Sequence, residues 1–176
     1  NILLVGNSGA GKTSLIHAII NNYYGFNVPN SCENILSINT LKDQGISYYR
    51  NEVRVFCQTS SNILGKKKIL LLDDIDTINE HSQQVFRNCI DKYSHNVAFI
   101  ASCCNTQKVI DSLQSRMDIV KIFPYGKEEL TRIANNISIM EDINMEEGVI
   151  DFITTVCNGS IRILINYLEK FKLVNI

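Results

Sequence analysis

The sequence predicts an α/β protein in which helices cover a parallel sheet of five strands, followed by a small helical subdomain. Over residues 1–123, short continuous apolar runs alternate with helical patterns. Such alternation is typical of parallel sheets that are buried on both faces. After Pro124 the strand pattern stops and only helical periodicity remains. We therefore expect two domains, residues 1–123 and residues 124–176.

The expected strands and helices of the first domain follow one another in regular order. The apolar runs that predict strands lie at residues 2–5, 34–39, 68–74, 96–102 and 118–123. Helical patterns separate them at residues 15–20, at about 46–59 and at 85–93. The segment "SNILGKKK" (61–68) is expected to be a polar, solvated turn.

The second domain is expected to consist of three helices. Apolar stripes at helical spacing comprise Leu130, Ile133, Ala134 and Ile137 in the first and Ile161, Leu164, Ile165 and Leu168 in the last. A further helix is expected around residues 146–157. Such stripes bury against neighbouring helices, so this domain should have a core of its own.

Composition sets broad limits on function. The chain has 176 residues, of which 45% are hydrophobic, so it can bury a core and is not disordered. The net charge of −1 gives no global basic field. Contact with nucleic acid would therefore need a local basic patch or assembly into something larger.

Cysteine usage and hydropathy indicate the compartment. The six cysteines form no C-x-x-C pair and most lie in apolar surroundings, which suits buried thiols in a reducing compartment rather than a zinc site. No apolar run approaches the ~20 residues of a membrane span. We expect an intracellular protein without membrane contact. Because the chain starts with Asn1 directly before a strand, we also expect it to be part of a longer polypeptide.

A glycine-rich segment separates the first strand from the first helix. Residues 6–13, "GNSGAGKT", satisfy the whole G-x-x-x-x-G-K-[ST] template in a strand-turn-helix setting. Short glycine patterns are often simple turns, but the full template in this setting favours nucleoside triphosphate binding. The residues expected to bind it are Gly6, Asn7, Ser8, Gly9, Ala10, Gly11, Lys12, Thr13 and Ser14.

The residue types in this segment fit a triphosphate. Glycines let backbone N–H groups approach an anion, and the following helix presents its positive end. Lys12 would meet the β and γ phosphates, and the Thr13 hydroxyl would bind Mg²⁺.

Two adjacent carboxylates follow the apolar run "ILLLDD". Asp73 fits the role of metal-side carboxylate, and Asp74 stands where a catalytic carboxylate would orient water. Carboxylates also commonly cap the turn between a strand and a helix. The glycine-rich segment upstream makes the catalytic interpretation the stronger one.

Two arginines are candidates for contact with a γ phosphate. Arg116 lies in the polar turn "LQSRMD" before the last strand, and Arg162 follows the Asn158–Gly159 break near the start of the last helix. A lone arginine is usually a surface residue. Arginine beside a γ phosphate, however, neutralises transition-state charge and is worth about 10³ to 10⁵ in rate.

The runs "ILSINTLKDQGISYYRNEVRVF", "ILLLDDID", "LQSRMDIVKIF" and "NGSIRILINYL" together resemble the small subunits of replication factor C type clamp loaders, over essentially the whole chain. The resemblance implies an AAA+ P-loop ATPase core with a helical lid, ATP and Mg²⁺ as cofactors, and a hetero-oligomeric arc of five subunits. Its implied partners are the other subunits, a sliding clamp and primer-template DNA. The implied location is intracellular, in the nucleus or a replication compartment if the source is eukaryotic or viral.

The resemblance also implies roles for matching residues. Ser115 and Arg116 match the start of the family's Ser-Arg-Cys motif, whose arginine reaches the ATP of the adjacent subunit. Arg162 matches the lid arginine called sensor 2. The helix "GISYYRNEVRVF" matches the region that faces clamp and DNA, and Arg87 lies in the helix that lines the DNA channel.

Several positions depart from the family pattern. Asp74 replaces the usual glutamate, and Met117 replaces the cysteine of Ser-Arg-Cys. Cys104 aligns with the sensor 1 asparagine, so either Asn105 substitutes through a loop shift or this sensor is weak. The family's adenine-binding segment before the first strand and its carboxyl-terminal collar are not in this sequence.

Three hypotheses follow. The first is an ATP-hydrolysing clamp-loader subunit, with Lys12, Asp73, Asp74 and Arg116 as catalytic residues. The second is an ATP-binding scaffold subunit that hydrolyses little at its own site and lends Arg116 to its neighbour. The third, a P-loop nucleoside kinase, would not need the Ser115–Arg116 turn and usually has several lid arginines.

Overall fold

The structure is a computed structural model that describes residues 1–25, 31–39, 45–143, 145 and 148–174. Its internal contacts divide the chain into two compact units. Asn1–Val5 and Lys12–Lys121 form one, here called the sheet unit, and Gly6–Gly11 and Ile122–Ile176 form the other, the helical unit. The two domains proposed from the sequence remain a prediction, and the grouping of residues 6–11 with the helical unit was not anticipated.

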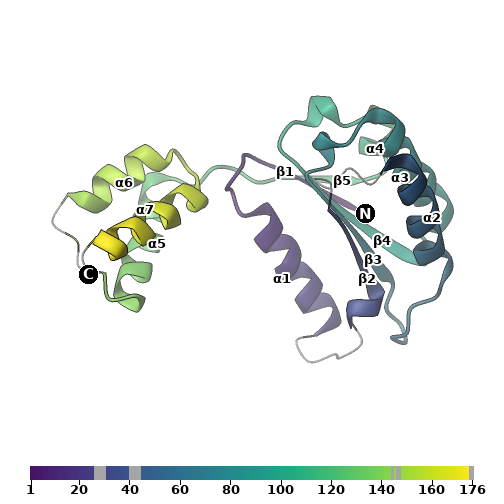
Figure 1. Cartoon of the computed structure of the whole chain (residues 1–176), viewed down its shortest axis with the longest axis horizontal. Coiled ribbons are helices and arrows are strands. Elements are labelled where there is room, and N and C mark those ends of the chain that lie inside the picture. Colours follow the sequence, from purple (N-terminus) through teal and green to yellow (C-terminus); the bar gives the residue numbers. More distant parts are fainter. Residues whose placement is uncertain (26–30, 40–44, 144, 146–147, 175–176) are drawn as a thin grey trace. The chain divides into compact units, whose positions relative to one another are not determined.

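The sheet unit contains a five-stranded sheet in the order β2-β3-β4-β1-β5, in which every pairing is parallel (Figure 1). Its strands are β1 (Ile2–Val5), β2 (Ile35–Asn39), β3 (Lys68–Asp73), β4 (Val97–Cys103) and β5 (Asp118–Lys121). The predicted fold class is thus confirmed. The last strand is shorter than the expected 118–123, because β5 pairs only with β1, whose final residue Val5 lies opposite Lys121.

Helices cover both faces of this sheet, with α1 on one face and α2 and α3 on the other (Figure 1). The helices are α1 (Lys12–Tyr24), α2 (Gly45–Gln58), α3 (Glu80–Tyr93) and the short α4 (Asp111–Gln114). Short 3₁₀ turns at Ser31–Asn34 (η1), Ile75–Thr77 (η2) and Thr106–Lys108 (η3), like α4, were not predicted. Their lengths of three or four residues give too little periodicity to detect in a sequence.

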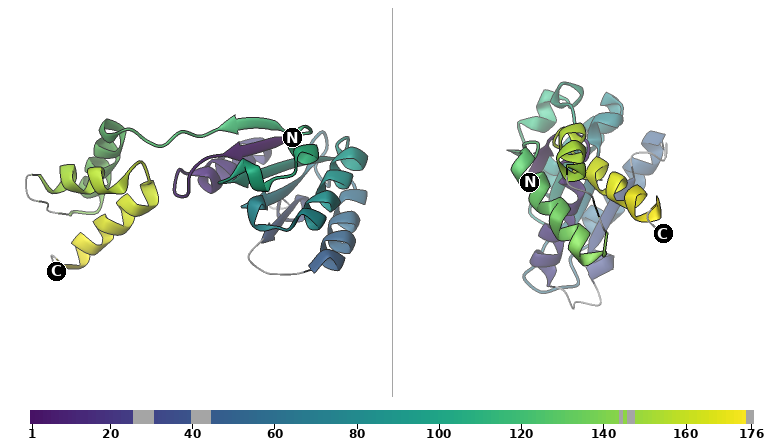
Figure 2. Two further views of the ribbon diagram at one scale, coloured as in Figure 1. Left: turned by 90° about the horizontal axis from the view of Figure 1, so that it is seen from above. Right: turned by 90° about the vertical axis from the view of Figure 1, so that its left-hand side faces the viewer.

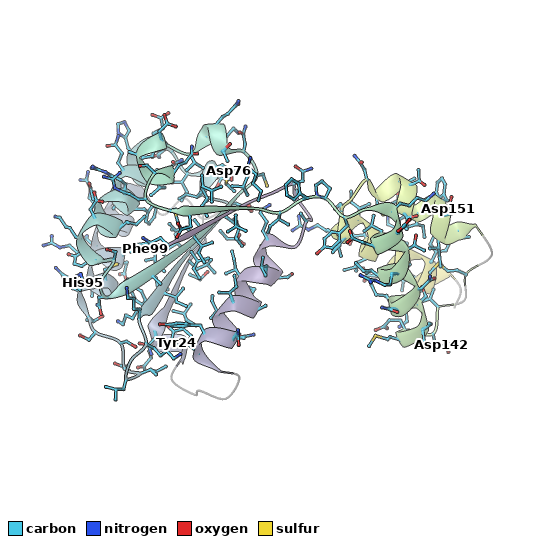
Figure 3. All side chains as sticks on the ribbon, turned by 180° about the vertical axis from the view of Figure 1, so that it is seen from behind. Tyr24, Asp76, His95, Phe99, Asp142 and Asp151 are labelled. Carbon is cyan, nitrogen blue, oxygen red and sulfur yellow. The ribbon has the colours of Figure 1, made fainter. Side chains whose placement is uncertain are left out.

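One core cluster of the sheet unit lies between the sheet and the helices α2 and α3, and Ile16 and Ile20 of α1 are also buried. Phe99 of β4, which is labelled in Figure 3, is fully buried in this cluster. Phe86 of α3 and Leu70 and Leu72 of β3 are fully buried in the same cluster. The helix spacing of Phe86 and Cys89 therefore predicted the buried face correctly. This packing fixes the strand ends from which the candidate site is built.

The helical unit contains three longer helices, α5 (Lys127–Met140), α6 (Val149–Cys157) and α7 (Ile161–Val174), which share one core (Figure 2). Leu130, Ala134, Leu164 and Leu168 of the predicted stripes are buried in it. Ile165 is not, since its side chain is 46% exposed on α7. The expected start of α6 near residue 146 falls partly on residues 146–147, which lie outside the described residues.

Among the helices that the structure describes, none combines the length and apolar character needed to cross a membrane.

Candidate nucleotide and magnesium site

Three neighbouring strands bring the predicted phosphate and metal residues of the sheet unit to one edge. Because β3, β4 and β1 are adjacent and parallel, their carboxyl ends meet at the same edge of the sheet. Asp73 is the last residue of β3, and Lys12 and Thr13 open the helix α1 in the same unit. Ligands of open α/β sheets bind at this edge.

Thr13 and Asp73, the two predicted metal ligands, are in direct contact. The Thr13 hydroxyl donates a hydrogen bond to Asp73 Oδ2 at 2.9 Å. The Ser102 hydroxyl, at the end of β4, donates to Asp73 Oδ1 at 2.5 Å. Ser102 is completely buried, so the Asp73 carboxylate is held in a fixed orientation by a residue that cannot turn toward water.

This donor set fits Mg²⁺. Hydroxyl and carboxylate oxygens are hard ligands, and Mg²⁺ typically takes one or two protein oxygens, several waters and the phosphates of its substrate. The pair Thr13–Asp73 offers two such oxygens, which leaves the other positions around the ion to water and phosphate.

Asp74 has an uncommon backbone conformation. Its φ of 52° and ψ of 51° place it in the left-handed region, which non-glycine residues seldom occupy. Its N–H donates to Ser102 Oγ at 3.0 Å, and its carbonyl accepts from the Thr77 hydroxyl at 2.8 Å. Such a conformation costs about 1–3 kcal/mol and persists only where surrounding contacts enforce it. The catalytic role of Asp74 stays a prediction.

The loop after β4 puts Cys104 rather than the Asn105 side chain beside Lys12. Lys12 Nζ donates to Cys104 Sγ at 3.2 Å, whereas Asn105 Oδ1 accepts from Gln107 N at 2.9 Å and caps the turn η3. Asp76 Oδ2 accepts from the backbone N–H groups of Cys104 and Asn105, at 3.2 and 3.0 Å, and fixes this loop (Figure 3). The predicted nucleotide contact of Asn105 stays a prediction.

The neighbouring thiol of Cys103 does not add charge to this edge. Burial, with smaller contributions from Asp76 and others, raises the pKa of Cys103 to about 11. The thiol is therefore neutral near pH 7, and the carboxylates of the site are not opposed by a thiolate.

In the helical unit, the glycine-rich segment lies against the start of α7. Arg162 Nη1 donates to Ser8 Oγ at 3.1 Å, and Ile161 N donates to the Gly9 carbonyl at 3.1 Å. Arg162 and the loop predicted to bind phosphate are thus in contact within this unit. The partner of the arginine in this contact is an uncharged hydroxyl, which competes weakly with an anion for a guanidinium.

Glycine is required at position 9 by both conformation and space. Its φ is +79°, and a Cβ there would lie 2.2 Å from Ser160 Oγ. At Gly6 a Cβ would lie 2.7 Å from the Ile122 carbonyl oxygen, a backbone atom that cannot easily move. The turn between them is closed by Ala10 N donating to the Asn7 carbonyl at 3.2 Å. In the sequence, Gly11 at the end of this loop is followed directly by Lys12 and Thr13.

Arg116 lies away from these groups, at the junction of α3 and α4. Its Nε donates to Asp91 Oδ1 of α3 at 2.6 Å, and its Nη1 donates to the Ser112 carbonyl at 2.6 Å. The side chain is 28% exposed, so it is partly packed rather than fully solvated. The contact of Arg116 with a neighbour's nucleotide stays a prediction.

Sequence reasoning missed three residues of these sites. Ser102 is the polar residue that ends the apolar run "VAFIAS", which is a usable signal for a functional strand end. Asp91 follows Arg87 by four residues on a predicted helix, a spacing that suggests an ion pair. Asp76 gives no such signal, because its partners are backbone groups of a loop 28 residues away.

A basic groove of about 530 Å³ lies between α2 and α3. Arg50, Arg54 and Lys92 line it together with amide side chains, and no carboxylate is among the described residues of its lining. It gives the nearly neutral chain the local basic patch that nucleic-acid contact would need.

Comparison with known proteins places this geometry in a family. A family model for the ATPase family associated with various cellular activities (AAA) matches residues 2–125. The chain is 33% identical over 175 residues to a replication factor C small subunit of Methanococcus maripaludis, covering 99% of this chain and 55% of that protein. It is 28% identical over 171 residues to replication factor C subunit 4 of Saccharomyces cerevisiae, covering 97% and 52%.

Solved structures agree in fold. A point mutant of Thermotoga maritima RuvB matches with a TM-score of 0.75 at 18% identity, over 96% of this chain and 53% of that one. The chain thus spans about half the length of the curated relatives it matches. The resemblance to replication factor C small subunits that the sequence suggested is confirmed by these relatives. With the family model covering most of its length, the chain belongs to the ATPase family associated with various cellular activities, AAA.

Proposed function

We propose that this chain is the nucleotide-binding part of a clamp-loader subunit, which binds ATP with Mg²⁺ and hydrolyses it to load a sliding clamp onto primer-template DNA. The observation that carries the ATP site is the Thr13–Asp73 hydrogen bond at the sheet edge, directly after a complete P-loop sequence. The clamp-loader assignment is supported by similarity to replication factor C small subunits along nearly the whole chain.

Each group at the sheet edge has a task in this proposal. Lys12 would bind the β and γ phosphates, and Thr13 and Asp73 would hold Mg²⁺, which neutralises phosphate charge when it is bound. Ser102 keeps Asp73 oriented. Asp74 would accept a hydrogen bond from the attacking water and orient it.

Two arginines would complete the charge stabilisation from different subunits. Arg162 would exchange its Ser8 hydroxyl partner for a phosphate oxygen of the nucleotide on its own chain. Arg116 would act in trans on the nucleotide of the adjacent subunit of a hetero-oligomeric arc.

The groove between α2 and α3 supports contact with DNA. Arg50, Arg54 and Lys92 offer three cationic groups to a phosphate backbone, with Asn51 and Asn88 as neutral hydrogen-bonding groups beside them. Binding of this kind is independent of sequence and weakens steeply with salt. It suits a protein that must act at any primer-template junction inside a replicating cell.

A second candidate is a scaffold subunit that binds ATP but hydrolyses little of it. The contact that favours it is Lys12 with Cys104, because a thiol is a weak hydrogen-bond donor toward a γ phosphate. Asp74 also has a shorter side chain than the glutamate of the family pattern.

Single-turnover hydrolysis separates the two candidates. The full-length protein is measured alone, then with its neighbouring subunits, clamp and primed DNA, using radiolabelled ATP. Hydrolysis at this chain's own site that rises on assembly supports the first candidate. Tight ATP binding with no such hydrolysis supports the scaffold, and no ATP binding contradicts both.

A further inference from the structure

The partner of Arg116 is a carboxylate outside the candidate ATP site. Asp91 Oδ1 accepts from Arg116 Nε at 2.6 Å, while Arg116 Nη1 donates to the Ser112 carbonyl. Two sides of the guanidinium are therefore held by α3 and α4. Its Nη2 group has no hydrogen-bond partner among the residues that the structure describes.

A second arginine shares the same carboxylate. Arg87 Nε lies 3.5 Å from Asp91 Oδ2, one turn earlier on α3. The hydrogen bond from Arg116, and the charges of both arginines, hold the pKa of Asp91 below its ordinary value. Asp91 is therefore ionised near neutral pH, and the group of two arginines and one aspartate carries a net charge of about +1.

This arrangement leaves Arg116 ordered and still attractive to an anion. A free arginine side chain has many rotamers and must lose them when it binds phosphate. Here the Nε edge is bound before any phosphate arrives, while the charge of Asp91 is shared with Arg87. The open Nη2 group is the one that a phosphate oxygen can reach.

We propose that Asp91 is the positioning residue of Arg116: it holds the Nε edge of the guanidinium so that the Nη2 edge meets a phosphate of the nucleotide on the adjacent subunit. This inference rests on the proposed trans role of Arg116. Asp91 does not touch the nucleotide and acts only through Arg116.

The test measures ATP hydrolysis at the neighbour's site in the full-length assembly, with the other sites silenced. Because a misplacement of about 1 Å can cost a hundredfold in rate, Asp91→Asn should lower kcat there by about ten- to a hundredfold and leave KM for ATP unchanged. Asp91→Glu, which keeps the charge, should recover part of the loss. In an Arg116→Ala background, Asp91→Asn should cost nothing further, since its effect passes through the arginine.

Asp111→Asn is the matched control. It removes the same charge from the first turn of α4, five positions before Arg116, and should leave kcat unchanged. Unaltered kcat in Asp91→Asn, faster hydrolysis, or a further loss in the Arg116→Ala background would each overturn the inference. Faster hydrolysis would mean that Asp91 restrains the arginine instead of positioning it.

Comparing Arg116→Ala with Asp91→Asn at the neighbour's site separates failure of the inference from failure of the proposed trans role. If Arg116→Ala has no effect on hydrolysis at the neighbour's site, the result contradicts both the proposed trans role and the inference that rests on it. If Arg116→Ala impairs that site and Asp91→Asn does not, only the inference falls. Should Asp91→Asn lower the melting temperature enough to unfold the chain, Asp91→Glu alone replaces it, because it keeps the charge but moves the carboxylate relative to Arg116 Nε. A partial loss of kcat at the neighbour's site is then expected, and unchanged kcat would overturn the inference.

Discussion

Two aspartates of the sheet unit, Asp73 at the sheet edge and Asp91 at the α3–α4 junction, have opposite surroundings. Asp73 accepts hydrogen bonds from the hydroxyls of Thr13 and Ser102, oxygen groups of the kind that accompany a carboxylate around Mg²⁺. Asp91 lies between the guanidinium groups of Arg87 and Arg116, so this group of three side chains has a net positive charge. The first arrangement suits a cation and the second an anion. The partners of a carboxylate, rather than the carboxylate itself, decide which ligand a region can take.

If this contrast is correct, the sheet edge serves this chain's own nucleotide and the α3–α4 junction serves a neighbour's. A variant in one region should therefore change ATP affinity or hydrolysis at one of the two sites and leave the other site unchanged.

Arg116→Ala is expected to have the largest effect. Loss of a trans arginine should lower hydrolysis at the adjacent site by about 10³-fold or more, while ATP affinity at this chain's own site stays within about twofold. The measurement mixes the mutant chain with wild-type neighbours whose sites are read individually. A defect confined to this chain's own site would show that Arg116 acts in cis or structurally.

Lys12→Ala tests the sheet edge. Loss of the charge-assisted contact with phosphate should weaken ATP binding about a hundredfold, since such contacts contribute roughly 1.5–3 kcal/mol and more when they are buried. Isothermal calorimetry on the full-length protein measures this. Lys108→Ala removes an exposed lysine from the same unit and is the control. Undiminished affinity in Lys12→Ala would contradict the P-loop assignment.

Arg162→Ala should have an intermediate effect in cis. Its present partner is the Ser8 hydroxyl, and an exposed arginine-phosphate contact is worth about tenfold in affinity. We expect about tenfold weaker ATP binding at this chain's own site and an unchanged rate at the neighbour's. Arg132→Ala, on the exposed face of α5, is the control. Equal losses in both variants would mean that only the general charge of the helical unit matters.

Asp74→Glu should have the smallest effect, and it is a gain. The longer side chain brings the carboxylate closer to the attacking water, so hydrolysis in the assembled complex should rise about three- to tenfold with ATP affinity nearly unchanged. Single-turnover rates measure it. A loss of activity instead would mean that the left-handed backbone at Asp74 already places the shorter carboxylate correctly.

The sequence predicted the regular parts of the molecule better than the contacts between loops. Apolar runs and helix spacing located the parallel sheet and its longer helices, because burial imposes a period on the sequence. Thr13 and Asp73 were each proposed as magnesium ligands, Thr13 from the P-loop template and Asp73 from its place at the end of an apolar run, and the structure brings the two side chains together. Asp91 and Asp76 could not be placed in this way. The spacing of Arg87 and Asp91 indicates their ion pair, but Asp91 meets Arg116, and Asp76 meets backbone amides, across distant turns, and no local pattern records those contacts.

The position of Cys104 illustrates the same limit. From the sequence, either Cys104 or its neighbour Asn105 could have faced the P-loop lysine. The choice depends on which side chain caps the following turn, and the structure gives that task to Asn105. The capping hydrogen bond joins residues two positions apart, but the contact of Lys12 with Cys104 that accompanies it joins residues 92 positions apart.

The hydrogen bond from Ile161 to the Gly9 carbonyl has a consequence for biosynthesis. A ribosome adding roughly 5–20 residues per second needs about 8–30 s between making these two residues. The phosphate loop therefore emerges among the first residues of this segment but acquires its α7 neighbours only near the end. During that interval the Gly9 carbonyl lacks the N–H donor that Ile161 later provides. Nucleotide capture by the nascent chain should accordingly wait until α7 has been made.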